Sequence, residues 1–401
     1  MSTLCKRCII PANATNVTLD SGGICNLCRT YERLKPALTD FAALEKVRFD
    51  RLAKAKGKGR YDALVGLSGG KDSSYVAYKL TREFGMKLLI ITYDNGFLSD
   101  IARKNIEIVV KALGQDHRFV SPGKALNKTI CQNSIRRYGV PCLGCTFPGF
   151  AACIKIAVEN DIPLLVHGRS RAQMFKDLAP GAVDPHLPFL EGNLQPVDIG
   201  RNRHFLLAMA GKLNRALRGV ARDPRFADEV SQLFTIDTAR IAAAKEPSEF
   251  IGYFLYEKYD EELIRAELQR AIGWAKPGGP DLLGHEDCRV HPAAAYLYTV
   301  DHGYPLMQQE LAVMVRDGSI SREEALARLD GNRHVKHLSP EAMEELSQFS
   351  GIPGVKILHY ARRVHKLLKV LQFLLRLRNR LFGRYLEART PLVSLRRRAR
   401  E

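Results

Sequence analysis

The feature that most constrains the fold is a glycine-rich bend between a predicted strand and a predicted helix. The apolar residues 63–67 favour a strand, and residues 74–84 have the pattern of a helix. Two adjacent glycines in the bend would let backbone N–H groups approach phosphate oxygens without a Cβ in the way. The helix that follows would point its positive end at the same place. The bend reads Ser68, Gly69, Gly70, Lys71, Asp72 and Ser73, and it predicts a phosphate-binding loop.

The side chains of the bend fit that role. Ser68 and Ser73 add hydroxyl donors, and Lys71 adds positive charge. Asp72 would repel a bare phosphate, so its natural role there is to hold Mg²⁺. The Walker A loop does not fit, because Lys71 stands where its second glycine is required and Asp72 stands where Ser or Thr is required. The other interpretation is an ordinary glycine-rich turn.

The surrounding pattern alternates strands with helices, which predicts an α/β fold with a parallel sheet covered on both faces. Ligands of such sheets bind at the carboxyl ends of the strands. Tyr93 and Asp94 follow the second predicted strand, and Gly168 follows the fourth. The predicted strands are residues 63–67, 87–92, 117–120 and 162–167, and the helices between them are residues 74–84, 101–113 and 147–159.

The 401 residues are enough for one large core or two modest ones. Beyond residue 200 the pattern becomes helical, and Ser321 with Glu324 forms a capping-box pattern at the start of a late helix. The predicted parts are a zinc ribbon (1–30), a helical connector (31–58), the α/β domain (59–200), a helical substrate-binding region (201–335) and a basic helical tail (336–401).

Four of the nine cysteines form two tight pairs near the start of the chain. Cys5 and Cys8, then Cys25 and Cys28, have the spacing of a four-thiolate zinc site, which would be structural because it leaves no open position. An odd cysteine count and no secretory-type start favour a reducing, cytoplasmic compartment.

A second group consists of Cys142 and Cys145, with Cys288 far along the chain. It has two interpretations. The pair can be structural with Cys288 coincidental, or the three can converge in sulfur or cluster chemistry, and spacing alone does not decide between them. Cys131 and Cys153 lie among apolar positions of helical pattern and are expected in the core.

The run from Ser68 to Ser73 closely resembles the signature of the PP-loop (adenine nucleotide alpha hydrolase-like) ATP pyrophosphatases. The resemblance implies cleavage of ATP between its α and β phosphates and adenylation of a substrate oxygen, with Lys71 and Asp72 at the phosphates. It also implies that the end of the second strand, here Tyr93 and Asp94, contacts adenine and that Gly168 lies near the nucleotide.

Two branches of that superfamily resemble this chain. The opening cysteine pattern and the late pair Gly273 and Trp274 resemble the N-acetyl sugar amidotransferase-like family of surface-polysaccharide biosynthesis. That implies amidation of a nucleotide-sugar substrate with ammonia from a separate glutaminase subunit. Cys142, Cys145 and Cys288 instead resemble the cysteines of iron–sulfur-dependent tRNA thiolases, which implies a [4Fe–4S] cluster and sulfur transfer. A third hypothesis is a zinc-ribbon nucleic-acid-binding protein.

The formal net charge of +18 is concentrated near the end of the chain. Residues 362–401 hold 13 Lys or Arg against two acidic residues, so the rest of the chain is only mildly basic. Apolar residues recur at helical spacing over residues 355–386, which predicts a basic amphipathic helix. Such a helix suits an anionic membrane surface, here the inner face of the membrane, or a docked position with a solvated basic face. The last arginines, from Arg396 to Arg400, suit RNA phosphates.

Overall fold

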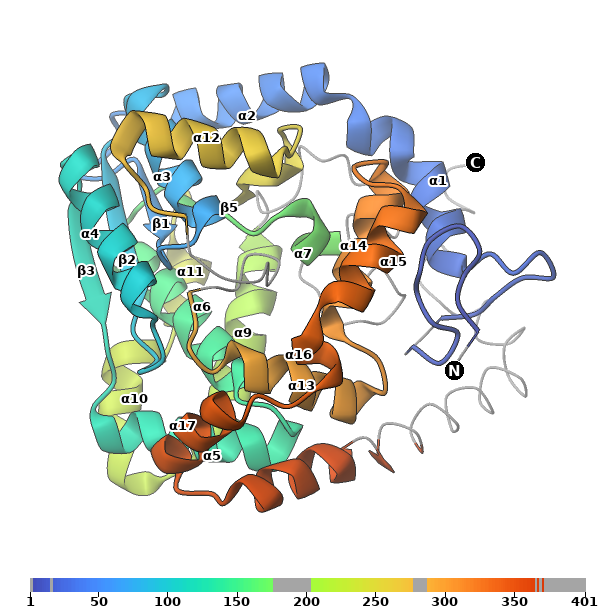
Figure 1. Cartoon of the computed structure of the whole chain (residues 1–401). Coiled ribbons are helices and arrows are strands. Elements are labelled where there is room, and N and C mark those ends of the chain that lie inside the picture. The colour runs from blue at the N-terminus through green and yellow to red at the C-terminus, as the bar shows by residue number, and fades with distance from the viewer. Residues whose placement is uncertain are drawn as a thin grey trace, which may run out of the picture.

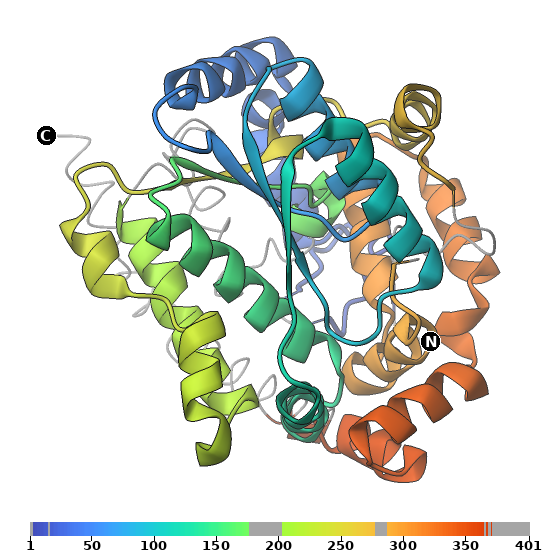
Figure 2. The ribbon, with the colours of Figure 1, turned by 90° about the vertical axis from the view of Figure 1, so that its left-hand side faces the viewer.

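The computed structural model describes residues 3–14, 17–175, 203–276, 287–364, 366–367 and 370. At its centre lies a five-stranded sheet with the order β3-β2-β1-β4-β5, in which every pairing is parallel (Figures 1 and 2). The strands are β1 (Ala63–Gly66), β2 (Leu88–Tyr93), β3 (Asp116–Val120), β4 (Leu164–His167) and β5 (Glu249–Gly252). The α/β class and the parallel sheet predicted from the sequence are confirmed.

Strict alternation along the strands divides the core into two parts. Ala63 and Val65 of β1 belong to one buried cluster, whereas Leu64 between them belongs to the other. Successive side chains of a strand point to opposite faces, so a strand that is apolar throughout needs cover on both sides. The helices supply that cover.

The first face of the sheet is covered by helices that pack on and around α3. This helix (Lys71–Arg82) follows β1 directly and contacts three strands. Beside it lie α4 (Asp100–Leu113) and α12 (Glu261–Ile272), and α12 runs along α3 in Figure 1. The connector forms two further helices, α1 (Asn26–Thr39) and α2 (Phe41–Ala55).

The second face is covered mainly by α6 (Cys142–Glu159) and α9 (Arg203–Val220). Near them lie α5 (Lys124–Tyr138), η2 (Pro224–Phe226), α10 (Ala227–Phe234) and α11 (Thr238–Ala243). By length and composition α6 could cross a membrane, the one such helix among the described residues. It packs against β1, β2 and β4, however, and Ala151, Ala152 and Ile154 are fully buried, as in a core helix.

A helical layer from the last third of the chain lies beyond the carboxyl ends of the strands and reaches the cysteine module (Figure 1). Ser321 caps α15 and accepts a hydrogen bond of 3.0 Å from the Glu324 N–H, as the capping-box pattern predicts. The helices are α13 (His291–His302), α14 (Leu306–Asp317), α15 (Arg322–Gly331), α16 (Arg333–Lys336) and α17 (Pro340–Ser350). Shorter pieces before this layer are α7 (Arg171–Phe175) and η3 (Tyr253–Leu255).

Three elements differ from the sequence predictions. Helix α6 begins at Cys142, about one turn before the predicted start, because Gly144 packs on α5 and donates a backbone hydrogen bond of 2.9 Å to Ser134 Oγ. Helix α5 was given no range in the sequence prediction, although Cys131 within it was expected at an apolar position of helical pattern. Strand β5 comes from a stretch predicted to be helical, and its four residues become a strand by pairing with β4.

The start of the predicted tail helix is present over residues 354–364. It docks on the body through fully buried Ile357 and Ala361, and Arg363 donates a 2.6 Å hydrogen bond to the carbonyl oxygen of Arg136. Its outer face carries exposed basic residues, and Leu367 beyond it is 62% exposed. Most of the remaining predicted helix and the arginines from 396 to 400 lie outside the described residues.

The connector is fixed to the edge of the sheet by Arg51, whose guanidinium is almost fully buried. It donates to Glu249 Oε2 at 2.9 Å, to the Tyr256 hydroxyl at 2.6 Å and to the Phe250 carbonyl at 3.2 Å. We expect Arg51→Met to lower the free energy of unfolding by about 3 kcal/mol, because it leaves Glu249 without its buried partner. Urea denaturation measures this.

Arg240→Met is the matched control. Arg240 also bonds a carboxylate at 2.9 Å, that of Asp161, but both side chains are substantially exposed. An exposed pair of this kind contributes about 0 to 1 kcal/mol. Equal losses for the two variants would contradict the assignment of Arg51 as the anchor of the connector.

Candidate functional site

The glycine-rich bend lies at the carboxyl end of β1, and the first turn of α3 includes Lys71, Asp72 and Ser73. Ser73 Oγ accepts a 3.1 Å hydrogen bond from the Ser68 N–H, which closes the bend on itself. Gly70 is the N-cap of α3 and has no side-chain cap, so backbone N–H groups at the start of the helix are left for a ligand. The local geometry is that of an anion-binding loop.

Gly69 has a left-handed backbone, with φ at +81°, and a Cβ there would lie 2.3 Å from the carbonyl oxygen of Ala102. The bend is therefore wedged against α4, and only glycine fits. Gly168, after β4, also lies close to the first turn of α3, since a Cβ added there would lie 2.8 Å from the Asp72 carbonyl oxygen. The ends of β1 and β4 thus meet around the start of α3.

Lys71 and Asp72 form a buried charged group with residues from α12. The Lys71 ammonium lies 3.2 Å from Glu261 Oε1 and 3.6 Å from Asp72 Oδ1. Burial raises the pKa of Asp72, while Lys71 and a hydrogen bond from Tyr259 act in the opposite direction. Burial also raises the pKa of Tyr259 well above its usual value, so its hydroxyl keeps its proton and donates to Asp72 at 2.9 Å.

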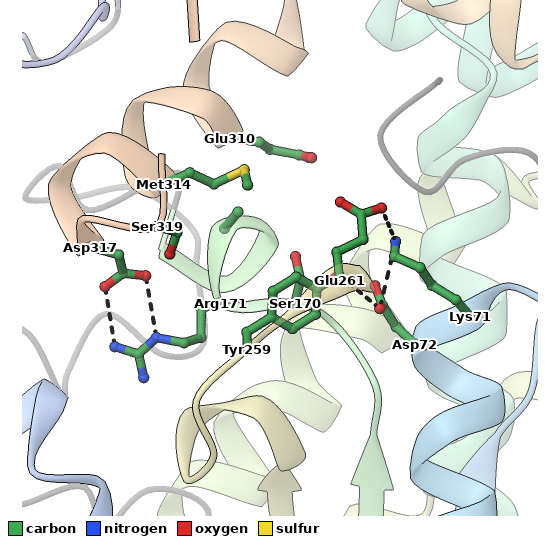
Figure 3. A pocket seen from close by; sticks show the side chains of 11 residues that line it. Lys71, Asp72, Ser170, Arg171, Tyr259, Glu261, Glu310, Met314, Asp317 and Ser319 are labelled. Carbon is green, nitrogen blue, oxygen red and sulfur yellow. Dashed lines mark hydrogen bonds and ion pairs between the residues drawn. The ribbon is translucent and has the colours of Figure 1, made fainter. Parts of the chain in front are cut away.

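Figure 3 shows these residues on one side of a pocket whose opposite wall comes from α14 and the turn after it. Glu310 and Met314 lie on that wall, as does Asp317, which pairs with Arg171 at 3.3 Å. The pocket therefore extends from the glycine-rich bend to the wall formed by α14, and acidic and basic side chains both line it. Sequence reasoning missed Tyr259, Glu261 and the whole α14 wall, because no motif connects them to the bend.

The residues predicted near adenine lie at the carboxyl end of β2, where Tyr93 is the last residue of the strand and Asp94 follows it. Tyr93 turns its ring toward the second core cluster, where it meets Phe234 edge-on at 6.0 Å, and burial raises the pKa of its hydroxyl well above the usual value. Asp94 accepts from the Gly96 N–H at 2.9 Å and pairs with Arg103 at 3.0 Å. Asp94 therefore shapes the turn after β2, and the Tyr93 ring serves mainly as packing.

That turn leads directly to the second cysteine group. Asn95 donates its side-chain amide to Cys145 Sγ at 3.0 Å, and Leu98 forms a β-bridge with Cys288. Cys142 and Cys145 lie in the first turn of α6 and are close enough to Cys288 to raise the pKa of its thiol, although burial is the larger cause. Burial likewise raises the pKa of Cys145 to about 12. The start of α6 and the segment of Cys288 thus both meet the turn after β2, which brings the three predicted cysteines into one neighbourhood. Each of the three is partly exposed.

The four N-terminal cysteines converge more tightly, and they are the one such group of potential metal ligands within the described ranges. Cys5 and Cys28 have their sulfurs 3.9 Å apart, and those of Cys8 and Cys25 are 3.8 Å apart. Bonds of about 2.3 Å from a tetrahedral zinc ion place its sulfurs about 3.8 Å apart. The spacing fits one zinc ion held by four thiolates.

The second cysteine group would need a wider spacing. A [4Fe–4S] cluster is ligated at its corners, so the sulfurs of cysteines 142, 145 and 288 would have to lie farther apart than the 3.8 to 3.9 Å of the N-terminal group.

The cysteine module also supports the far wall of the pocket. Arg316 of α14 donates to Cys8 Sγ at 3.6 Å, and Gln308 of the same helix donates to the Ile9 carbonyl at 2.7 Å. Arg322 at the start of α15 donates to the Cys8 carbonyl at 3.2 Å. A metal in the module would therefore hold in place the helix that carries Glu310 and Asp317.

No protein-family model matches the sequence, and no curated protein sequence matches it. Among solved structures, the U34-tRNA thiolase NcsA from Methanococcus maripaludis with its [4Fe-4S] cluster is similar to this chain. The match covers 84% of this chain and 90% of that chain, with 14% sequence identity and a TM-score of 0.34.

We expect purified protein to contain about one zinc ion per chain, and Cys8→Ser to remove it. Without the metal, the four buried thiols lose the ion that would join them, so we expect the module to open locally. Elemental analysis measures the metal, and hydrogen exchange measures the opening of residues 3–14 together with α14. A zinc-free protein in which both segments stay protected would contradict the metal site.

Proposed function

We propose that this chain is an ATP pyrophosphatase that adenylates an oxygen of its acceptor with release of pyrophosphate. A sulfur nucleophile then bonds to the carbon that carries this oxygen, and AMP leaves with the oxygen. The observation that carries the proposal is the phosphate-binding bend with a buried carboxylate and ammonium at the start of the same helix. Cys142, Cys145 and Cys288, beside the turn after β2, are the reason that we propose sulfur as the transferred group. Each part has its own support.

The nucleotide part rests on the surroundings of Lys71 and Asp72. The bend offers backbone N–H groups, the Ser68 and Ser73 hydroxyls and the positive end of α3, all suited to the phosphates of ATP. Asp72 offers carboxylate oxygens suited to Mg²⁺. An ammonium, a metal ion and oriented N–H groups together stabilise the charge that develops when pyrophosphate leaves. The carboxyl ends of β2 and β4 lie at the same edge of the sheet, where the adenosine would extend.

The sulfur part rests on Cys142, Cys145 and Cys288. They lie at the same strand-end edge of the sheet as the bend, and Asn95 connects the turn after β2 to Cys145. Partly exposed cysteines grouped beside an activating site suit sulfur chemistry better than packing. A [4Fe–4S] cluster held by three cysteines would keep one iron open to carry sulfur. The same cysteines would hold it, and the Asn95 amide would donate to one of its ligands.

Nitrogen transfer to an N-acetyl nucleotide sugar, predicted from the resemblance, would share with sulfur transfer every step up to and including adenylation. It would use ammonia from a glutaminase subunit in place of sulfur. No feature of the described residues favours it over sulfur transfer, and grouped cysteines have no evident task in it. The metal content of the protein separates the two reactions.

For the nucleotide part, we expect Asp72→Asn to lower the release of pyrophosphate from ATP at least 100-fold, because the carboxylate that would hold Mg²⁺ is lost. Ser68→Ala should lower it about tenfold through the loss of one donor. A coupled assay of pyrophosphate, with water as the background acceptor, measures both. Asp100→Asn is the control, since Asp100 also lies in the first turn of a helix but is exposed. Undiminished release by Asp72→Asn would refute the site.

For the sulfur part, we expect anaerobically prepared protein to be brown, with about four iron and four sulfide ions per chain, and Cys288→Ala to lose them. Cys153→Ala is the matched control: burial alone raises the pKa of that thiol to about 12, with no contribution from another cysteine. Visible absorption and elemental analysis measure both variants. A colourless, iron-free wild-type preparation would favour nitrogen transfer.

A further inference from the structure

A single segment, residues 259–275, crosses the phosphate-binding bend and contacts it at both ends; we call it the strap. Its first part places Tyr259 against Asp72 and Glu261 against Lys71, as Figure 3 shows. Its middle is α12, which packs along α3. Its last part places Trp274 against Gly69. The strap thus touches the bend at three residues proposed to handle phosphate.

The Trp274 contact fixes the direction of one peptide group. The indole Nε1–H donates to the Gly69 carbonyl oxygen at 3.1 Å, and the indole is 2% exposed. In a trans peptide the C=O of one residue and the N–H of the next point in opposite directions. Holding the Gly69 carbonyl against the strap therefore aims the Gly70 N–H away from it, toward Ser68 Oγ at 3.4 Å. A phosphate bound by the Gly70 N–H and the Ser68 hydroxyl would lie on that side of the bend.

This peptide group needs such an anchor. Gly69 and Gly70 carry no side chains to oppose rotation, so the peptide between them is the least restrained part of the bend. Trp274 is itself anchored by its neighbour Ala275, whose N–H donates to Asn105 Oδ1 at 2.9 Å and whose carbonyl accepts from Asn105 Nδ2 at 3.0 Å. The anchor is therefore rigidly attached to α4.

The other end of the strap sets the position of an ammonium. Glu261, the first residue of α12, forms ion pairs with Arg265 of the same helix at 2.8 Å and with Lys71 at 3.2 Å. All three side chains are largely buried. A lysine side chain has many rotamers, and a fixed carboxylate selects those that keep its charge beside Asp72.

We propose that Trp274 and Glu261 are positioning residues for the nucleotide phosphates: Trp274 aims the Gly70 N–H and Glu261 places the Lys71 ammonium. The inference rests on the proposed binding of ATP at the bend. Neither residue needs to touch the nucleotide. Their effect is confined to ligands with a polyphosphate, because the groups that they orient serve phosphate alone.

The test compares binding of the Mg²⁺ complex of α,β-methylene ATP with binding of adenosine, both by isothermal titration calorimetry. In Trp274→Phe and Glu261→Gln we expect the analogue to bind about tenfold more weakly, the effect of one hydrogen bond to a charged group. Adenosine should bind both variants as it binds the wild type. General damage to the fold would weaken the binding of both ligands. The ratio of the two affinities therefore distinguishes a loss of phosphate positioning from a loss of folded structure.

Glu262→Gln is the control for Glu261→Gln, since Glu262 is the next residue, also pairs with Arg265, at 3.3 Å, and is 79% exposed. It should bind both ligands normally. If Trp274→Phe does not fold, Glu261→Gln decides alone. Unchanged affinity for the analogue, or an equal loss for both ligands, would overturn the inference while the proposed function stands. A wild-type protein that does not bind the analogue would overturn both.

The chain offers a second readout because Trp274 is its single tryptophan. Its indole is bonded to the bend, so its fluorescence reports on that peptide directly. The analogue should shift or quench the emission, and adenosine should leave it unchanged. An emission that responds equally to both ligands would contradict the contact between the strap and the phosphate region.

Discussion

The Gly69 peptide is confined between α4 and the Trp274 indole, and the arrangement of the site follows from that confinement. Ala102 of α4 leaves no room for a side chain at Gly69, and Trp274 holds its carbonyl from the other side. The bend cannot move without displacing α4 or the strap. A preorganised set of donors does not have to reorganise when charge develops on a phosphate, which is why rigidity matters at such a site.

The same confinement explains what sequence could predict. The bend is local: glycines, hydroxyls and a helix start within ten residues predict a phosphate-binding loop without knowledge of the rest of the chain. Strands β1, β2 and β4 were equally accessible, because a strand buried on both faces is apolar throughout. Strand β3 lies at the edge of the sheet, is largely exposed and carries mostly polar residues, so this signal is weaker there. Strand β5 was not, since its residues become a strand only by pairing with β4. The early start of α6 depends on how Gly144 packs on Ser134, which no local pattern contains.

The partners of the site were hidden for a related reason. Glu261 and Tyr259 lie about 190 residues beyond Lys71 and Asp72, at the start of α12 and two residues before it, and α12 has an ordinary amphipathic pattern. Gly273 and Trp274 were visible only as a resemblance to a family, and the structure gives them a physical role: Gly273 ends α12 with a left-handed backbone, and Trp274 then reaches the bend. The cysteines were an intermediate case. Their identities were evident, but their convergence required the bridge between Leu98 and Cys288.

The N-terminal cysteine module supports α14, which forms one wall of the pocket, and this gives the module a function beyond its own folding. Its backbone accepts hydrogen bonds from Gln308 and Arg322, so α14 is held by a module that a metal would stiffen. The opposite wall carries Lys71 and Asp72 on α3, which the sheet holds. An acceptor between these walls would be positioned by the module on one side and activated from the other. A binding surface supported by its own module can change its acceptor without disturbing the bend, because the contacts that hold the bend come from α3, α4, the strap and the turn after β4.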